Sequence, residues 1–196
     1  PTLKALVDNL LTDAEGYSKF RIGEYEPYLS TETLLDILKS SNYYNNYENP
    51  TGIYLKAGES CLVAVDGIDN QHQVKLTIKN WVEDESSSTY PLRNGLNYIT
   101  ASTEGNLFVS YYTDDLENAP NIRAHFINAP IQGYWDQATM TNADWVELLK
   151  GRSVNDNSIL ITRSEHAQLA FPVSAWLKYC PTNVDSTMTL YQQVQW

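Results

Sequence analysis

Cysteine, histidine and basic residues are scarce in this 196-residue sequence, and each scarcity excludes a class of protein. Two cysteines, Cys61 and Cys180, cannot build a disulfide framework, so the fold must depend on a hydrophobic core. Cys61 lies in an apolar run, which predicts a small buried core residue. The alternative is a bridge to Cys180, which would require an oxidising compartment.

Positive charge is too sparse for binding to polyanions. Thirteen basic residues against 24 acidic ones give a net charge of −11, and no basic cluster is present. Nucleic acids and anionic membrane surfaces are therefore excluded as partners. No apolar run approaches the roughly 20 residues of a membrane helix, so membrane insertion is not expected. The start at Pro1, without Met or an export leader, predicts a trimmed or processed piece.

The motifs of common catalytic sites are also missing. The three histidines are His72, His125 and His166, and the closest two are 41 positions apart (166 − 125), so there is no H-E-x-x-H zinc motif. No G-x-S-x-G elbow and no Gly-rich phosphate loop occur. We therefore assign no catalytic and no metal-binding residue. The acidic groups at 66–69 and 114–117 lack the spacing of a calcium loop and are interpreted as solvated loop acids.

The first fifty residues are predicted to form an N-terminal helical segment. Leu3, Leu6, Val7, Leu10 and Leu11 recur at helical spacing. Ser30 or Thr31 can cap a second helix, whose apolar face carries Leu34, Leu35, Ile37 and Leu38. Residues 16–27, between these helices, are predicted to be a loop. The polar, aromatic stretch that ends at Pro50 places a domain boundary near residue 50.

Residues 51–130 have the pattern of a β-sandwich. Apolar and polar residues alternate over 74–79, 107–112 and 122–126, which predicts half-buried strands. Residues 61–65 are apolar at every position and predict a central strand. Strands at this spacing favour an antiparallel, jelly-roll-like sandwich. With the flanking helices, the fold class is α+β, mainly β.

Residues 131–196 are predicted to form a mixed helix and strand segment. Thr141 and Asp144 have the spacing of a capping box before a helix, and Gly151 stands where that helix would end. Residues 159–161 predict a short buried strand, and Pro172 is expected in the first turn of another helix.

Aromatic residues are abundant, with 14 Tyr and 5 Trp. Tyr134 and Trp135 follow a stretch that is typical of a loop, so they are the candidate ligand-binding residues, because exposed aromatic rings can stack on sugars. The alternative is that they pack in the core. Tyr43, Tyr44 and Tyr47 form a weaker cluster of the same kind.

Four passages of the sequence share an order and spacing with one protein family. They are residues 51–59 with the Gly58-Glu59 turn, 90–97, 127–149 with Ala129-Pro130 and Asp144-Trp145, and 158–180. Through these passages, residues 52–180 resemble the opening portion of the enhancin-like metallopeptidases, peptidase family M-sixty. No passage is diagnostic by itself, but the order and spacing of four passages carry the likeness. One departure is Ala138, where many relatives have glycine, and a larger one is the missing H-E-x-x-H with its downstream Glu ligand.

The resemblance implies a parent protein that is exported and displayed on the surface of a host-associated bacterium, often of the gut. Its substrate would be a glycoprotein such as mucin, and its cofactor would be zinc, held C-terminal to the residues seen here. No catalytic or zinc-binding residue of the family can be carried onto this sequence. The chain would be the sandwich that packs against its own catalytic domain, with 131–196 leading toward that missing region.

Two other functions stay open at this point. The chain could be a stand-alone carbohydrate-binding module, although its net negative charge opposes tight binding of sialylated or sulfated mucin. It could also be a structural or adhesive surface domain, which would have neither glycan affinity nor a stability that depends on zinc.

Overall fold

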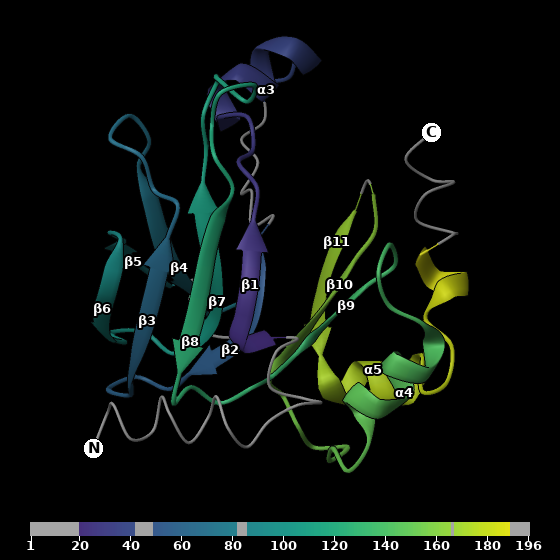
Figure 1. Ribbon diagram of the computed structural model, residues 1–196. Coiled ribbons are helices and arrows are strands. Elements are labelled where there is room, and N and C mark those ends of the chain that lie inside the picture. Colours follow the sequence, from purple (N-terminus) through teal and green to yellow (C-terminus); the bar gives the residue numbers. More distant parts are fainter. Residues whose placement is uncertain (1–19, 42–48, 82–85, 166, 189–196) are drawn as a thin grey trace. The chain divides into compact units, whose positions relative to one another are not determined.

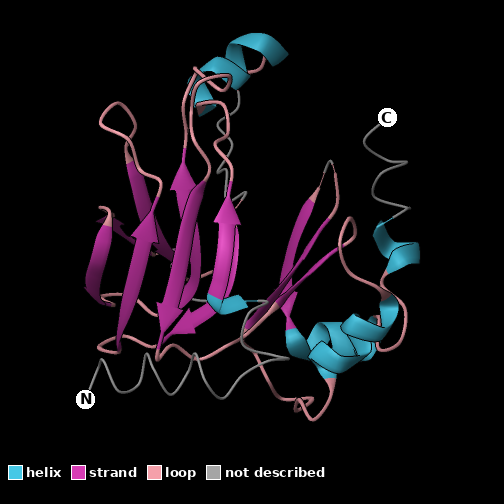
Figure 2. Cartoon of the chain, viewed as in Figure 1, coloured by secondary structure: helices cyan, strands magenta, loops and turns pink. Residues whose placement is uncertain are grey.

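The computed structural model describes residues 20–41, 49–81, 86–165 and 167–188 (Figure 1). Strands dominate these ranges, as Figure 2 shows. The chain divides after Ile131 into two compact units, the first with two sheets and the second with one. The elements in chain order are β1 (Ile22–Tyr25), α3 (Thr31–Leu38), β2 (Pro50–Leu55), β3 (Ser60–Asp66), β4 (Val74–Lys79), β5 (Ser87–Pro91), β6 (Gly95–Thr100), β7 (Gly105–Tyr111), β8 (Ile122–Ile127), β9 (Tyr134–Asp136), α4 (Asn142–Leu149), β10 (Ile159–Arg163), β11 (Gln168–Pro172) and α5 (Val173–Tyr179).

The first unit is a sandwich of two antiparallel four-stranded sheets. One sheet has the strand order β1-β8-β3-β6 and the other β2-β7-β4-β5. Alternate residues of both sheets point inward and form one hydrophobic core, because side chains alternate between the faces of a strand. This confirms the mainly-β α+β class and the antiparallel sandwich, while the jelly-roll comparison stays a prediction. The inward side chains of the two central strand pairs include Cys61, Val63, Val65, Ile122, Ala124 and Phe126 from one sheet, and Val74, Leu76, Ile78, Leu107, Val109 and Tyr111 from the other.

The loop predicted over residues 16–27 is wrong for its described part. Ile22–Tyr25 form β1, which pairs antiparallel with β8 in the register Ile22 with His125 and Tyr25 with Ile122. Four residues with a glycine give too little alternation to identify a strand, so the pairing depends on β8, which lies about a hundred residues later. Part of the first fifty residues therefore belongs to a sandwich sheet. The division of the chain at residues 50 and 130 stays a prediction.

The second predicted N-terminal helix is confirmed as α3. Ser30 caps it, since its side-chain oxygen accepts a hydrogen bond from the backbone N–H of Thr33. Lys39 ends it in the left-handed conformation, with φ of 51°. The predicted helix over Leu3–Leu11 and the tyrosine cluster at 43–47 lie outside the described residues.

The burial of two predicted strands differs in detail from their patterns. On β4, Thr77 is buried although its position alternates with the core residues, and its hydroxyl shares a 2.7 Å hydrogen bond with Ser110 on β7. On β3, which is apolar at every position from 61 to 65, Leu62 and Ala64 are only half-buried. β3 is nevertheless central, between β8 and β6.

The second unit is a small sheet with helices. β10 lies between β9, to which it is parallel, and β11, to which it is antiparallel. The capping box before α4 is confirmed, since Thr141 and Asp144 exchange side-chain and backbone hydrogen bonds. Gly151 follows α4 with φ of 72°, as its predicted place at the helix end requires. Pro172 ends β11 and occupies the N-cap position of α5 without a side-chain hydrogen bond, so it stands one position before the helical turn in which it was expected.

Candidate functional site

Tyr134 and Trp135, the predicted ligand-binding pair, lie on β9 and not in a loop. β9 pairs with β10 in the register Tyr134 with Ile161 and Trp135 with Thr162. Trp135 is fully buried, and its indole N–H donates to the backbone oxygen of Thr141 at 2.9 Å. The loop interpretation failed because a three-residue strand is too short to show alternation.

The burial of Trp135 bears on the binding hypothesis. An enclosed indole offers no ring face to a sugar, whereas a half-buried ring such as that of Tyr134 can be reached from solvent. The geometry gives Trp135 a packing position and leaves Tyr134 as the accessible member of the pair. A ligand role for these two residues stays a prediction.

Histidine side chains do not form a zinc site in the part of the chain that the structure describes. The ring Nδ1 of His72 forms a 2.9 Å hydrogen bond with the carboxylate of Asp69, and His125 lies on β8. No group of three or more His, Cys, Asp or Glu side chains is placed to hold a metal ion within the described ranges. Catalytic zinc needs three protein ligands, so the residues described here do not fit that metal. His166 lies outside these ranges.

One acid of each acidic group, Asp69 and Asp114, accepts hydrogen bonds that stabilise a loop. Asp69 accepts from the backbone N–H groups of Gln71 and His72. Asp114 accepts from the Ser30 hydroxyl at 2.7 Å, and hydrogen bonds from Thr33 and Ser30 lower the pKa of its carboxyl. These contacts show that Asp69 and Asp114 stabilise the loops in which they lie.

Both cysteines are free thiols in the structure. Cys61 is a core residue of β3, and burial raises its pKa to about 12. The interpretation of Cys61 as a small hydrophobic core residue is thus confirmed, and the bridge to Cys180 is not formed.

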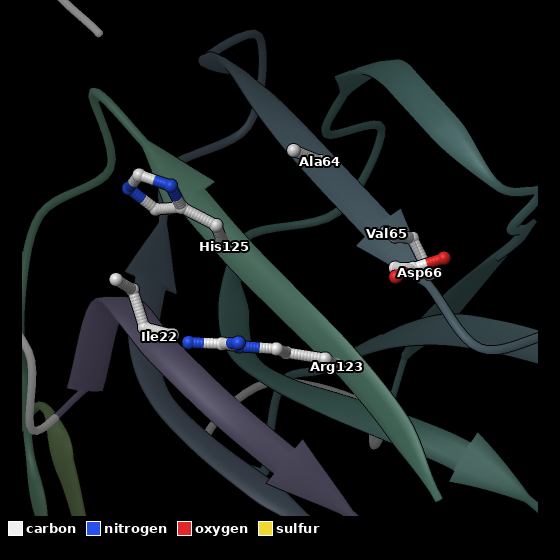
Figure 3. Close-up of a pocket in the computed structure, with 6 residues that line it drawn as sticks. All are labelled: Ile22, Ala64, Val65, Asp66, Arg123 and His125. Carbon is white, nitrogen blue, oxygen red and sulfur yellow. The ribbon is translucent and has the colours of Figure 1, made fainter. Parts of the chain in front are cut away.

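A pocket that the sequence did not predict opens on the outer face of the β1-β8-β3-β6 sheet (Figure 3). Its volume is about 290 Å³. Burial lowers the pKa of His125 below its ordinary value, and the positive charges of Arg21 and Arg123 lower it further. The feature of the sequence that could have indicated this pocket is the mixture of small, basic and acidic residues at the outward positions of β3 and β8. The lining consists of Ile22, Ala64, Val65, Asp66, Arg123 and His125.

None of the helices in the described ranges is long and apolar enough to cross a membrane. No family model and no curated protein matches the sequence. Solved structures do match it. A metallopeptidase in complex with Tn antigen is 29% identical, with a TM-score of 0.79 over 90% of this chain and 34% of that one. A metallopeptidase from Bacteroides thetaiotaomicron is also 29% identical, with a TM-score of 0.83 over 97% of this chain and 33% of that one.

A third match is more distant in sequence. The M60 catalytic domain of Clostridium perfringens ZmpC, in complex with the sialyl T antigen, is 15% identical with a TM-score of 0.69. It covers 88% of this chain and 39% of that one, and at this identity it shows the fold alone. The chain spans about a third of the length of the metallopeptidases it matches. The resemblance found in the sequence is thus confirmed: the chain matches the enhancin-like M60 metallopeptidases over their β-sandwich region.

Proposed function

We propose that this chain is the non-catalytic portion of a secreted or surface-displayed zinc metallopeptidase that degrades mucin-type glycoproteins. One observation carries the proposal: two metallopeptidases match almost all of this chain, while the chain matches only a third of each of them. Zinc, where the parent protein holds it, would activate a water molecule for peptide hydrolysis. The residues of this chain would support the catalytic region by packing against it.

The gene provides the first test. Reading it beyond Trp196, we expect an open reading frame that encodes H-E-x-x-H and a downstream Glu. A frame that stops at Trp196 contradicts the proposal.

A test on the protein shows whether this chain stabilises the catalytic region or only lies next to it. The full parent and a form that lacks residues 1–196 are expressed, and mucin cleavage and thermal unfolding are measured for both. We expect the truncated form to be insoluble, or to unfold several degrees lower and lose activity. The control is the full parent with Gln in place of the motif's Glu, which should keep its stability and lose only cleavage. A truncated form with full stability and activity overturns the supporting role.

Glycan binding is the second candidate function, and the outer-face pocket favours it. Two relatives were solved in complex with glycan antigens, Tn and sialyl T. Retention of the chain on immobilised mucin is measured at low and at high salt. Retention at both salt concentrations supports contacts to sugar that do not depend on screened charge. Absence of retention at both leaves a structural support domain.

A further inference from the structure

The outer-face pocket exists because a small residue occupies the middle of a cross-strand row. Ala64 on β3 pairs with Leu96 on β6 and with His125 on β8, and His125 pairs with Ile22 on β1. Leu96 is 60% exposed, so larger side chains stand on either side of the alanine methyl group. The hollow of about 290 Å³ lies just below the range of small-molecule sites and has room for a ligand of about one monosaccharide.

One wall of the pocket carries a guanidinium group that the described residues leave without an acceptor. Arg123 has Asp66 and Glu24 as its cross-strand partners, but it forms no ion pair or hydrogen bond through its side chain within the described ranges. Figure 3 shows its guanidinium extending toward Ile22, while the Asp66 carboxylate points away from it. Glu24 accepts a 3.0 Å hydrogen bond from Asn121. The five N–H donors of Arg123 are therefore available to an external acceptor.

Positive charge gathers here in a chain of net charge −11. Arg21 and Arg123 both lie close enough to His125 to act on its charge. The floor is formed by aliphatic side chains, which suit the apolar face of a pyranose ring.

We propose that this pocket binds a carboxylate-bearing monosaccharide, such as the acidic sugar at the end of a glycan chain. Arg123 donates paired hydrogen bonds to the carboxylate, in the fork geometry that guanidinium and carboxylate share. Asp66 accepts hydrogen bonds from ring hydroxyls, and Ile22, Ala64 and the His125 ring line the space that the sugar ring occupies. This inference rests on the proposed function, because a protein that acts on mucin would meet glycans that end in acidic sugars.

The test measures binding by the whole 196-residue chain, using backbone-amide chemical shifts in NMR titrations. The probes are sialyllactose, methyl glucuronide and lactose, so that two sources of the same carboxylate chemistry are compared with a neutral sugar. We expect one or both acidic sugars to shift the amides around Ala64 and His125, and lactose to have no effect at the same concentration. Equal shifts with lactose, or none with either acidic sugar, overturn the proposal.

Variants assign the effect to the pocket. Arg123→Gln should weaken binding of the acidic sugar about tenfold or more, because a charge-assisted pair is lost. Lys75→Gln, which removes an exposed charge on β4 in the other sheet, is the matched control and should leave the affinity unchanged. Ala64→Leu fills the hollow from its outward face and should abolish binding without lowering the melting temperature. Equal losses in Arg123→Gln and Lys75→Gln would show non-specific attraction. These results are independent of peptidase activity, so failure here is distinguishable from failure of the proposed function.

Discussion

At the scale of single residues, buried tryptophans organise the second unit. Trp135, Trp145 and Trp176 each donate the indole N–H to a backbone carbonyl, those of Thr141, Cys180 and Leu160. Trp145 and Trp176 meet edge to face, with ring centroids 5.3 Å apart. A buried tryptophan is stable when its N–H is paired, so each ring contributes both packing and a fixed link between elements.

Replacing Trp135 with Ala should therefore destabilise the protein. The change leaves a cavity and an unpaired Thr141 carbonyl, and we expect a loss of about 3–5 kcal/mol in the free energy of unfolding. Urea denaturation followed by circular dichroism measures it. Tyr98→Ala is the control, since that ring is 71% exposed and its loss should cost within about 0.5 kcal/mol. A stable Trp135→Ala protein that loses glycan binding would instead support the ligand role.

The buried thiol of Cys61 should be inert in the folded protein. Burial raises its pKa to about 12, so at pH 8 only about one thiol in ten thousand is ionised, and the thiolate is the nucleophile. In the variant Cys180→Ser, which retains only this thiol, we expect a disulfide reagent to react after denaturation and not before. Labelling of that variant under native conditions at the rate of a free peptide thiol would contradict this.

His125 should make stability depend on pH. Its folded-state pKa lies below the unfolded value near 6.5, so the unfolded chain binds more protons between these two values. Stability is therefore fully present above about pH 6.5 and decreases as the pH falls through the lower pKa. We expect His125→Gln to make the melting temperature depend less on pH between about pH 7 and pH 5, as scanning calorimetry would show. Arg123→Gln removes one cause of the lowered pKa of His125, so it should reduce the pH dependence of the melting temperature partly. An unchanged pH dependence in both variants would contradict the assignment to His125.

At the scale of elements, the pairing of β4 with β7 depends on Gly105. This residue begins β7 with φ of 153°, and a Cβ atom there would collide with the backbone carbonyl of Lys79 on β4. A side chain would push the two strands apart at the place where their ladder ends. The close approach of the backbones thus requires glycine.

Gly105→Ala should cost at least about 2 kcal/mol more than Gly58→Ala. Gly58 also has a positive φ, 83°, but open space surrounds the position of its missing Cβ, so it reports backbone strain alone. Chemical denaturation of both variants measures the difference. Equal losses of unfolding free energy in the two variants would mean that β4 and β7 can move apart at this point without loss of stability.

At the scale of the whole molecule, the chain should be stable without metal. No cluster of three ligands is present among the residues that the structure describes. We expect the melting temperature of this chain to be the same with EDTA and with added zinc, because only a ligand that binds the folded state shifts it. If the proposed function is right, a longer parent metallopeptidase should lose cleavage of mucin under EDTA. A rise of several degrees with zinc in this chain would contradict the expectation.

Much of the fold was predictable from local patterns. The alternation over 122–126 and the Thr141–Asp144 capping box depend on neighbours in sequence, and both are confirmed. β1 and β9 were missed because four and three residues are too short to show a period. The outer-face pocket was missed because its floor residue, Ala64, is an ordinary strand position until its neighbours on β6 and β8 are known.

The sequence by itself determined the mainly-β class, the capping box before α4, the absence of an H-E-x-x-H motif and the resemblance to enhancin-like metallopeptidases. Each of these depends on residue types and spacings along the chain, or on their absence. Only the tertiary structure decided that Trp135 is enclosed, that Cys61 is a free thiol, and that Arg123, His125 and Ala64 share one pocket. These facts depend on strand pairing between distant segments, and the register of such pairs is set by the whole sandwich.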